Sequence, residues 1–299
     1  MATALDRTRI QIARPDILAH FDAQPPVMRG KQIAAVLTQE RAGWRLAKHT
    51  TTADFIDFLK EYGSLREIAF AFPAGGETLY VWGKRPVPTL ELLLHLKPRS
   101  YYSHYTAMRL HGLTEQVPKV LYLSHERASD APTGTPLSQS AIDAAFQRPV
   151  RVSSNAVDFE DWQVLLINSA NTGELGVVDH DAQRGAEGRV NVRTTSVERT
   201  LIDAAVRPAY SGGVFEVAKA FELAKDGVSV NAMGAMLGKL RFTYPYHQAI
   251  GFYLERAGYR SSALDLMRRF PMEFDFYLTH EMSATRYVPA WRLHVPEGF

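Results

Sequence analysis

Two aspartates flank a histidine at Asp179-His180-Asp181, the most concentrated set of possible metal ligands in the chain. Carboxylate oxygens and an imidazole can share one ion. A nucleotidyltransferase would need a Gly-Ser turn shortly before such a pair of carboxylates, but Gly63-Ser64 lies far away in the sequence. We therefore interpret the three residues as a polar turn between strands, and we expect neither a metal nor another cofactor.

The other histidines have no evident catalytic partners. His104 and His111 are seven residues apart, on nearly the same face of one expected helix. His280-Glu281 lies near the C-terminus. There is no G-x-S-x-G turn for a serine nucleophile. The absence of cysteine excludes disulfides, thiolate catalysis and cysteine-based zinc sites. We interpret these histidines as core or surface residues.

Two other groups of charged and aromatic residues also have structural interpretations. Glu198, Arg199 and Asp203 could form a catalytic set, but Arg199 and Asp203 have the spacing of an ion pair within a helix. Three tyrosines of one short stretch could stack on bases. We prefer to interpret them as lining a domain interface. The three residues are Tyr101, Tyr102 and Tyr105.

The sequence patterns of several enzyme classes are missing. The chain contains neither G-x-x-x-x-G-K-[ST] nor G-x-G-x-x-G, the common phosphate-binding loops. No Asp-x-Lys or Glu-x-Lys occurs, so the carboxylate–lysine pattern of restriction-type nucleases is absent. We therefore expect that the protein is not an enzyme.

The N-terminal hundred residues are the basic part of a nearly neutral chain. The net charge is +2, whereas residues 1–100 carry 14 Lys and Arg against 10 Asp and Glu. Cations concentrated on a small domain favour binding to nucleic-acid phosphates. The candidate DNA-binding residues are Arg29, Lys31, Arg45, Lys48, His49, Thr50, Thr51, Thr52, Lys60, Arg66, Lys84 and Arg85.

Three short helices and a hairpin are expected to carry these residues. Apolar spacing and turn residues predict helices over 14–23, 28–40 and 52–62, and strands over 65–72 and 78–82. This order predicts a winged helix-turn-helix domain over residues 1–85. Its third helix would enter the major groove, and its hairpin would contact the DNA backbone. This helix departs from what is expected of a helix in the major groove. It carries three acidic residues, Asp54, Asp57 and Glu61, and a single basic residue, Lys60.

The sequence pattern over the remaining residues, 86–299, predicts a mixed sheet followed by helices. A connector over 84–100 includes a short helix, 90–96, and a loop is expected over 126–138. Strand patterns cover 119–124, 150–157, 162–168, 175–178, 190–193 and 272–278. Helical patterns cover 140–146, 214–225, 230–240, 246–257 and 262–270. The fold class is therefore α+β, with the sheet at about 119–193 and the helical part at about 195–270.

The stretch 195–213 begins the helical part. Thr195 and Glu198 have the spacing of a capping box, which starts a helix. Pro208 restricts the residue before it to extended geometry, so the helix should end there. Ser211-Gly212-Gly213 then forms a turn before the next helix.

This combination resembles a segment of the AbiEi family of antitoxins, which are transcriptional regulators paired with nucleotidyltransferase toxins. The stretch 100–118 is similar to the same family in a second way. It has a tyrosine-rich start, then a helix, then His111-Gly112-Leu113-Thr114 followed by Gln116 and Pro118.

The resemblance implies an antitoxin of a type IV toxin–antitoxin system, which acts in phage defence by abortive infection. It implies a winged-helix head that binds inverted repeats in the protein's own promoter, often cooperatively, and represses transcription. It also implies a C-terminal domain over 86–299 that counters an AbiEii-like nucleotidyltransferase toxin without requiring a stable complex. The expected partners are thus double-stranded DNA and, functionally, the toxin.

The sequence also bears on the cellular location of the protein. No run reaches the roughly 20 apolar residues of a membrane span, and the N-terminus lacks the apolar segment of a signal peptide. A cytoplasmic protein without a membrane partner is expected. A metal-dependent nuclease and a protein-interaction scaffold that uses its winged helix stay open as alternative functions.

Overall fold

The computed structural model describes residues 8–128, 137–183 and 189–299, and the chain divides into two compact units between Pro98 and Arg99. This division lies later than the expected boundary at 85/86. Helix α5 (Thr89–Leu93) and the residues after it belong to the first unit. Lys97 forms an ion pair there with Glu77.

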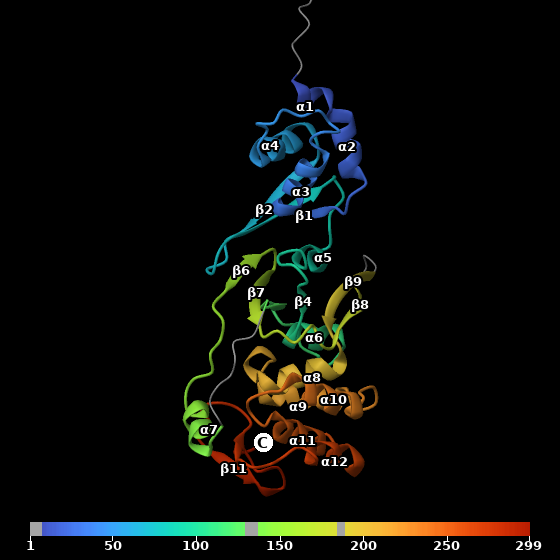
Figure 1. Cartoon of the computed structure of the whole chain (residues 1–299). Helices are drawn as coiled ribbons and strands as arrows, with labels where there is room; N and C mark the ends of the chain where they lie inside the picture. The colour runs from blue at the N-terminus through green and yellow to red at the C-terminus, as the bar shows by residue number, and fades with distance from the viewer. Residues whose placement is uncertain (1–7, 129–136, 184–188) are drawn as a thin grey trace, which may run out of the picture. The chain divides into compact units, whose positions relative to one another are not determined.

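The first unit contains helices and an antiparallel sheet (Figure 1). Its elements before α5 are α1 (Arg9–Ile12), α2 (Arg14–Asp22), β1 (Val27–Arg29), α3 (Gly30–Glu40), α4 (Thr52–Tyr62), β2 (Leu65–Phe70) and β3 (Glu77–Trp82). The sheet has the order β1-β3-β2. One apolar core joins the helices, with Phe21, Ile33 and Phe55 fully buried.

Strand β1 corrects the expectation of a helix from residue 28. Val27 and Met28 are buried and pair with Val81 and Tyr80 of β3. Helix α3 begins only at Gly30. The hairpin expected after the third helix is present, with Leu65 opposite Trp82 and Phe70 opposite Glu77.

The second unit begins with a six-stranded mixed sheet of order β6-β7-β5-β4-β9-β8. Its strands are β4 (Tyr101–Tyr102), β5 (Val120–Glu126), β6 (Ala156–Phe159), β7 (Trp162–Ser169), β8 (Val177–Gln183) and β9 (Arg189–Thr195). The pairs β5–β7 and β4–β9 are parallel, and the other neighbours are antiparallel. Most of the loop expected over 126–138 lies outside the described residues.

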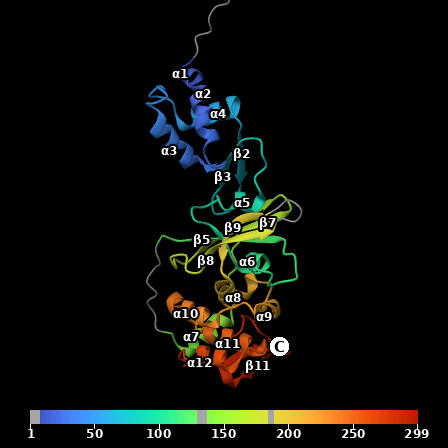
Figure 2. The same ribbon diagram turned by 90° about the vertical axis from the view of Figure 1, so that its right-hand side faces the viewer.

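Helices form a second layer of this unit. They are α6 (His104–Leu110), α7 (Gln139–Phe146), α8 (Val197–Val206), α9 (Val214–Leu223), α10 (Val230–Leu240), α11 (Tyr246–Arg256) and α12 (Ser261–Arg268), with a 3₁₀ turn η2 (Pro208–Tyr210). Figures 1 and 2 show α6 between the sheet and α8, with α9 to α12 beyond. Apolar side chains of α8 to α11 form the main core, which includes Leu201, Val217 and Ile250.

The C-terminal segment adds a small sheet where one strand was expected. It contains β10 (Phe276–Tyr277), β11 (Thr285–Val288), the 3₁₀ turn η3 (Pro289–Trp291) and β12 (Leu293–Pro296), in the order β10-β12-β11. The fully buried Trp291 anchors this segment in the core. The chain is thus a mixed α+β protein. None of the helices in the described part of the chain has the length and apolar character needed to cross a bilayer.

Candidate nucleic-acid interface

The start of α4 is fixed by a reciprocal cap between Thr51 and Asp54. The backbone N–H and the hydroxyl of Thr51 both donate to Asp54 Oδ2, at 2.9 and 2.7 Å, and the backbone N–H of Asp54 donates to Thr51 Oγ1 at 3.1 Å. The Thr51 hydroxyl bond is the main reason that the pKa of Asp54 is lowered. One acid of this helix is therefore a capping residue, and the Thr51 hydroxyl has an internal partner.

Arg41 holds the turn that joins α3 to α4. Its guanidinium donates to the backbone carbonyls of Ala47 at 2.7 Å, Lys48 at 3.3 Å and Thr50 at 2.8 Å. Within the same turn, Trp44 and Leu46 are buried while Arg45, between them, is exposed. Arg45 has φ +52°, a conformation uncommon outside glycine. The turn thus has a fixed interior and presents Arg45 to solvent.

The predicted DNA-binding residues fall into three groups. Two residues just before α4, Lys48 and His49, are exposed beside the partly buried Thr50 and Thr52. Lys31 is exposed in the first turn of α3. The exposed residues of the hairpin and the segment after it are Arg66, Lys84 and Arg85.

One of the predicted residues has partners inside the first unit, and another is partly buried. Lys60 forms an ion pair with Glu67 of β2 and lies over the ring of Tyr80. Arg29 is partly buried, and its charge contributes, after burial, to the lowered pKa of His95. These two cations are therefore less available to phosphate than Lys48 or Arg66.

The Asp179-His180-Asp181 set lies within strand β8, which corrects the expectation of a turn. Asp179 and Asp181 are exposed, and Asp181 accepts a hydrogen bond from Asn191 at 3.1 Å. Because side chains alternate along a strand, His180 points to the other face. Among the described residues, no three His, Asp or Glu side chains are arranged to hold a metal ion.

His180 instead pairs with His111, which sequence reasoning had not connected to it. The two ring centroids are 4.7 Å apart. His111 Nε2 bonds the carbonyl of Thr195 at 2.6 Å, and His180 Nε2 bonds that of Leu110 at 3.0 Å. Burial lowers the pKa of His111. The pair ties α6 to the two strands β8 and β9.

His104 lies in a buried polar cluster at the start of α6. Its Nδ1 is 2.8 Å from Ser103 Oγ, which is 2.7 Å from Ser124 Oγ. Its ring meets that of Tyr210 edge-on at 5.3 Å. Burial lowers the pKa of His104 to about 4. Ser103 is 1% exposed, so this cluster is a packed interior and offers no nucleophile to a substrate.

Arg199 and Asp203 form the ion pair expected from their spacing, with Nε and Oδ1 2.8 Å apart and both side chains buried. Arg199 also donates to the carbonyl of Leu175. Burial raises the pKa of Tyr101 to about 12, and Tyr102 is fully buried. Tyr101 and Tyr102 are thus interior residues of β4 and are not positioned to stack on bases.

The cap of α8 differs from the expected Thr195–Glu198 box. Ser196 is the N-cap, and its hydroxyl accepts from the N–H of Arg199. The Thr195 hydroxyl pairs with that of Thr200, and Glu198 accepts from the N–H of Ser229. The helix does end before Pro208, and α9 begins at Val214 as expected.

The C-terminal His280-Glu281 pair also serves the fold. His280 stacks on Phe146 at a centroid distance of 4.4 Å and bonds the carbonyl of Arg148. The backbone N–H of Glu281 donates to the carbonyl of Phe146. This pair joins the C-terminal segment to the end of α7.

Comparison with known proteins finds a similar solved fold. The crystal structure of the RV2827C protein from Mycobacterium tuberculosis aligns with a TM-score of 0.54 and 14% sequence identity, covering 98% of this chain and 94% of that chain. No protein-family model and no curated protein sequence matches the chain. At this identity the similarity is one of fold alone, and it extends over both units.

Proposed function

We propose that the first unit is a winged helix-turn-helix domain that binds duplex DNA, and that the protein is an antitoxin that represses its own promoter. The order of elements carries the DNA-binding part of this proposal. Helix α2, strand β1, helices α3 and α4 and the β2–β3 hairpin follow one another, with the sheet order β1-β3-β2. In this arrangement α4 takes the role of the helix in the major groove and α3 that of the helix across the backbone.

The exposed basic residues favour phosphate contacts at the N-terminal ends of these two helices. Lys31 lies in the first turn of α3, and Lys48 and His49 come just before α4. Free backbone N–H groups and the helix dipole attract anions at the same ends. At the start of α4 the carboxylate of Asp54 already caps part of this charge, so the proposal assigns the attraction for a phosphate there mainly to Lys48.

The acidic face of α4 limits where the phosphates can lie. Asp57 and Glu61 are exposed there, and Lys60, the single basic residue of the helix, is already paired with Glu67. Phosphates along this face would meet net negative charge. The proposal therefore assigns the backbone contacts to the beginning of α4 and to Arg66 on β2, which is exposed.

The antitoxin part rests on the two stretches that resemble the AbiEi family. Although far apart in the sequence, these stretches pack on each other through α6 and α8. His111 bonds the carbonyl of Thr195, and Thr114 bonds the carboxylate of Glu216 just after the second stretch. Two stretches that mark the same domain of a family are expected to contact each other in this way. In the proposal, this domain counters a nucleotidyltransferase toxin without a stable complex.

Fluorescence anisotropy with a labelled duplex from upstream of the gene tests DNA binding. Lys48→Ala and Arg66→Ala should each weaken binding at low salt and reduce the slope of log K against log [salt] by about 1. Lys219→Ala is the matched control, because Lys219 is an exposed lysine of the second unit. Equal affinity of wild type and both variants at every salt concentration would refute the proposed DNA face.

Coexpression tests the antitoxin role separately. Growth of cells that produce a nucleotidyltransferase encoded beside this gene should be restored by the full chain. Failure to restore growth, with promoter binding intact, would leave a DNA-binding regulator that is not an antitoxin. Incubation with plasmid and Mg²⁺ or Mn²⁺ tests the nuclease alternative, and cleavage that Asp179→Ala abolishes would overturn the proposal.

A further inference from the structure

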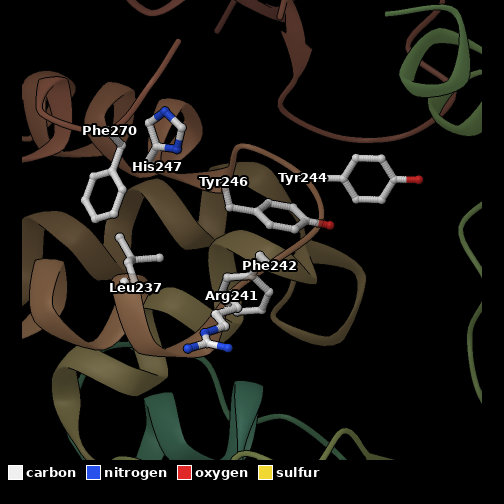
Figure 3. Close-up of a pocket in the computed structure, with 8 residues that line it drawn as sticks. Leu237, Arg241, Phe242, Tyr244, Tyr246, His247 and Phe270 are labelled. Atoms are coloured by element: carbon white, nitrogen blue, oxygen red, sulfur yellow. The ribbon is translucent and has the colours of Figure 1, made fainter. Parts of the chain in front are cut away.

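The polar groups of this chain that lack a partner differ in whether another molecule can reach them. Within the described residues, one such atom, Nε2 of His247, lies in the wall of a hollow of about 210 Å³ in the second unit (Figure 3). Because this nitrogen is buried, a molecule in the hollow could not bond it, and the hollow specifies no ligand. The carboxylate of Asp57 on α4, in contrast, is exposed.

The exposed face of α4 carries side chains that are already engaged and two that are not. Asp54 belongs to the cap of the helix, and Lys60 belongs to the ion pair with strand β2. Glu61 bonds the hydroxyl of the neighbouring tyrosine, Tyr62, and is the main reason that the pKa of this tyrosine is raised. The two exposed side chains that are left on this face are Ala53 and Asp57.

Asp57 points away from the core of the first unit. Counting about 100° per helical residue, its side chain lies directly opposite the mean direction of Phe55 and Leu59, which are both fully buried. Its charge acts through space on Lys60 and Tyr80, but within the described residues its carboxylate makes no hydrogen bond or ion pair. Asp57 is therefore at the centre of the face that α4 presents to a partner.

The position of Asp57 excludes contact with DNA phosphates, because like charges repel. The phosphate contacts of the proposed DNA face belong to Lys48 before α4 and to Arg66 on β2, both exposed. The centre of α4 is then left to face the base edges. Ala53, one turn before Asp57, has only a methyl group, so the helix can approach these edges closely.

The chemistry of a carboxylate restricts which base it can bond. An ionised carboxylate only accepts hydrogen bonds, and the donors in the major groove are the amino groups at N4 of cytosine and N6 of adenine. The adenine amino group lies between two acceptors, its own N7 and thymine O4, whereas the cytosine amino group has an acceptor, guanine O6, on one side only. A carboxylate is therefore repelled less beside cytosine than beside adenine.

We propose that Asp57 reads the sequence of the DNA that α4 enters, by accepting a hydrogen bond from the N4 amino group of one cytosine. This inference rests on the DNA-binding function proposed above. The carboxylate contributes selectivity more than affinity, because guanine and thymine at that position present acceptors or a methyl group to it. The acid at the centre of the face thus has a function in the major groove that a basic residue could not perform.

Selection of bound duplexes from a randomised library, with the full-length protein, tests this assignment. Wild type should enrich duplexes that share one position at which cytosine is required. Asp57→Ala should select the same sequence without a preference at that position, and Asp57→Asn should select adenine there, because an amide can bond both N6 and N7 of adenine. Glu61→Gln is the matched control, since it removes a negative charge from the same face and should leave the selected sequence unchanged.

Fluorescence anisotropy with the selected duplex then measures the size of the effect. Replacing the required C·G pair by T·A should weaken wild-type binding roughly tenfold or more, and binding of Asp57→Ala less than about twofold. The assignment is overturned if DNA binding persists but Asp57→Ala selects the same cytosine, or loses as much affinity as wild type on the replaced duplex. If wild type binds no duplex even at low salt, the proposed DNA-binding function fails, and this inference fails with it.

Discussion

Gly251 on α11 lies directly against the indole of Trp291. A Cβ built at this glycine would be 2.1 to 2.6 Å from three atoms of the six-membered ring. The same indole donates from Nε1 to Glu255 Oε2 at 2.8 Å, one turn further along α11, and Arg268 lies over its face. The C-terminal segment is therefore held to the helical layer at a position that admits no side chain.

Gly251→Ala should strongly destabilise the second unit. The added methyl group cannot be accommodated unless the fully buried indole moves and loses its bond to Glu255. Overpacking of this kind costs about 1–3 kcal/mol or more. The expected decrease of about 3–10 °C in the calorimetric transition of this unit can be measured on the full chain.

Gly238→Ala on α10 is the matched control for this prediction. Its Cβ would meet no atom within 4 Å, and alanine favours a helix over glycine by about 1 kcal/mol. Its transition temperature should therefore increase slightly. If both glycines tolerate alanine equally, the close approach of Trp291 does not constrain the fold.

Local sequence patterns predicted most helices of this chain because caps, stops and apolar spacing act within a few residues. The end of α8 before Pro208 and the start of α9 at Val214 are examples. Strands β1 and β4 were missed because three and two residues are too few to show a period. Their positions depend on partners such as β3 and β9, which are distant in the sequence.

The candidate sites were harder to predict than the helices, because contacts between residues distant in the sequence form them. Asp179-His180-Asp181 suggested a turn because it is polar, but an exposed edge strand such as β8 also carries polar side chains. The bonds from Arg41 run to carbonyls six to nine residues away in a turn without regular structure. No spacing rule predicts such contacts, and only the exposed charge of the neighbouring Lys48 could be inferred.

Arg199→Met should destabilise the second unit by about 3–5 kcal/mol, because it leaves the Asp203 carboxylate buried without its partner. The double variant Arg199→Met, Asp203→Leu should recover part of this loss, since no uncompensated charge remains. Denaturant unfolding of both proteins measures the difference.

The exposed pair of Lys219 and Glu222 on α9 provides a comparison. Its ion pair spans 3.6 Å in solvent, so Lys219→Ala should change the free energy of unfolding by less than about 0.5 kcal/mol. A double variant as unstable as Arg199→Met alone would show that packing of the guanidinium matters more than its charge.

Acid should weaken the second unit through His104. Burial lowers its pKa from 6.5 to about 4, so the unfolded chain binds the proton more tightly than the folded one. This contribution to stability is complete above about pH 6.5, decreases as the pH falls toward 4, and amounts to about 3 kcal/mol. The free energy of unfolding, measured between pH 8 and pH 4.5, should follow this course.

His104→Asn should flatten that dependence. Asparagine tolerates the left-handed conformation of this position, where φ is +51°, better than other uncharged polar residues do. The two proteins are compared at pH 8 to separate the packing effect from titration. An equally steep loss of stability in the variant would assign the acid sensitivity to other groups, such as the buried His247.

Arg41→Ala should weaken DNA binding without changing its salt dependence, in contrast to Lys48→Ala. Arg41 is committed to three backbone carbonyls of the turn before α4, so its loss loosens the turn that presents Lys48 while removing no phosphate contact. Arg41→Lys should not restore binding, because one ammonium group cannot donate to the carbonyls of both Ala47 and Thr50 as the guanidinium does.

Anisotropy titrations across a salt series measure both the affinity and its salt dependence. A decrease of about 1 in the salt slope for Arg41→Ala would instead mean that this guanidinium meets a phosphate, and an unchanged affinity would mean that the turn does not position the DNA-binding face.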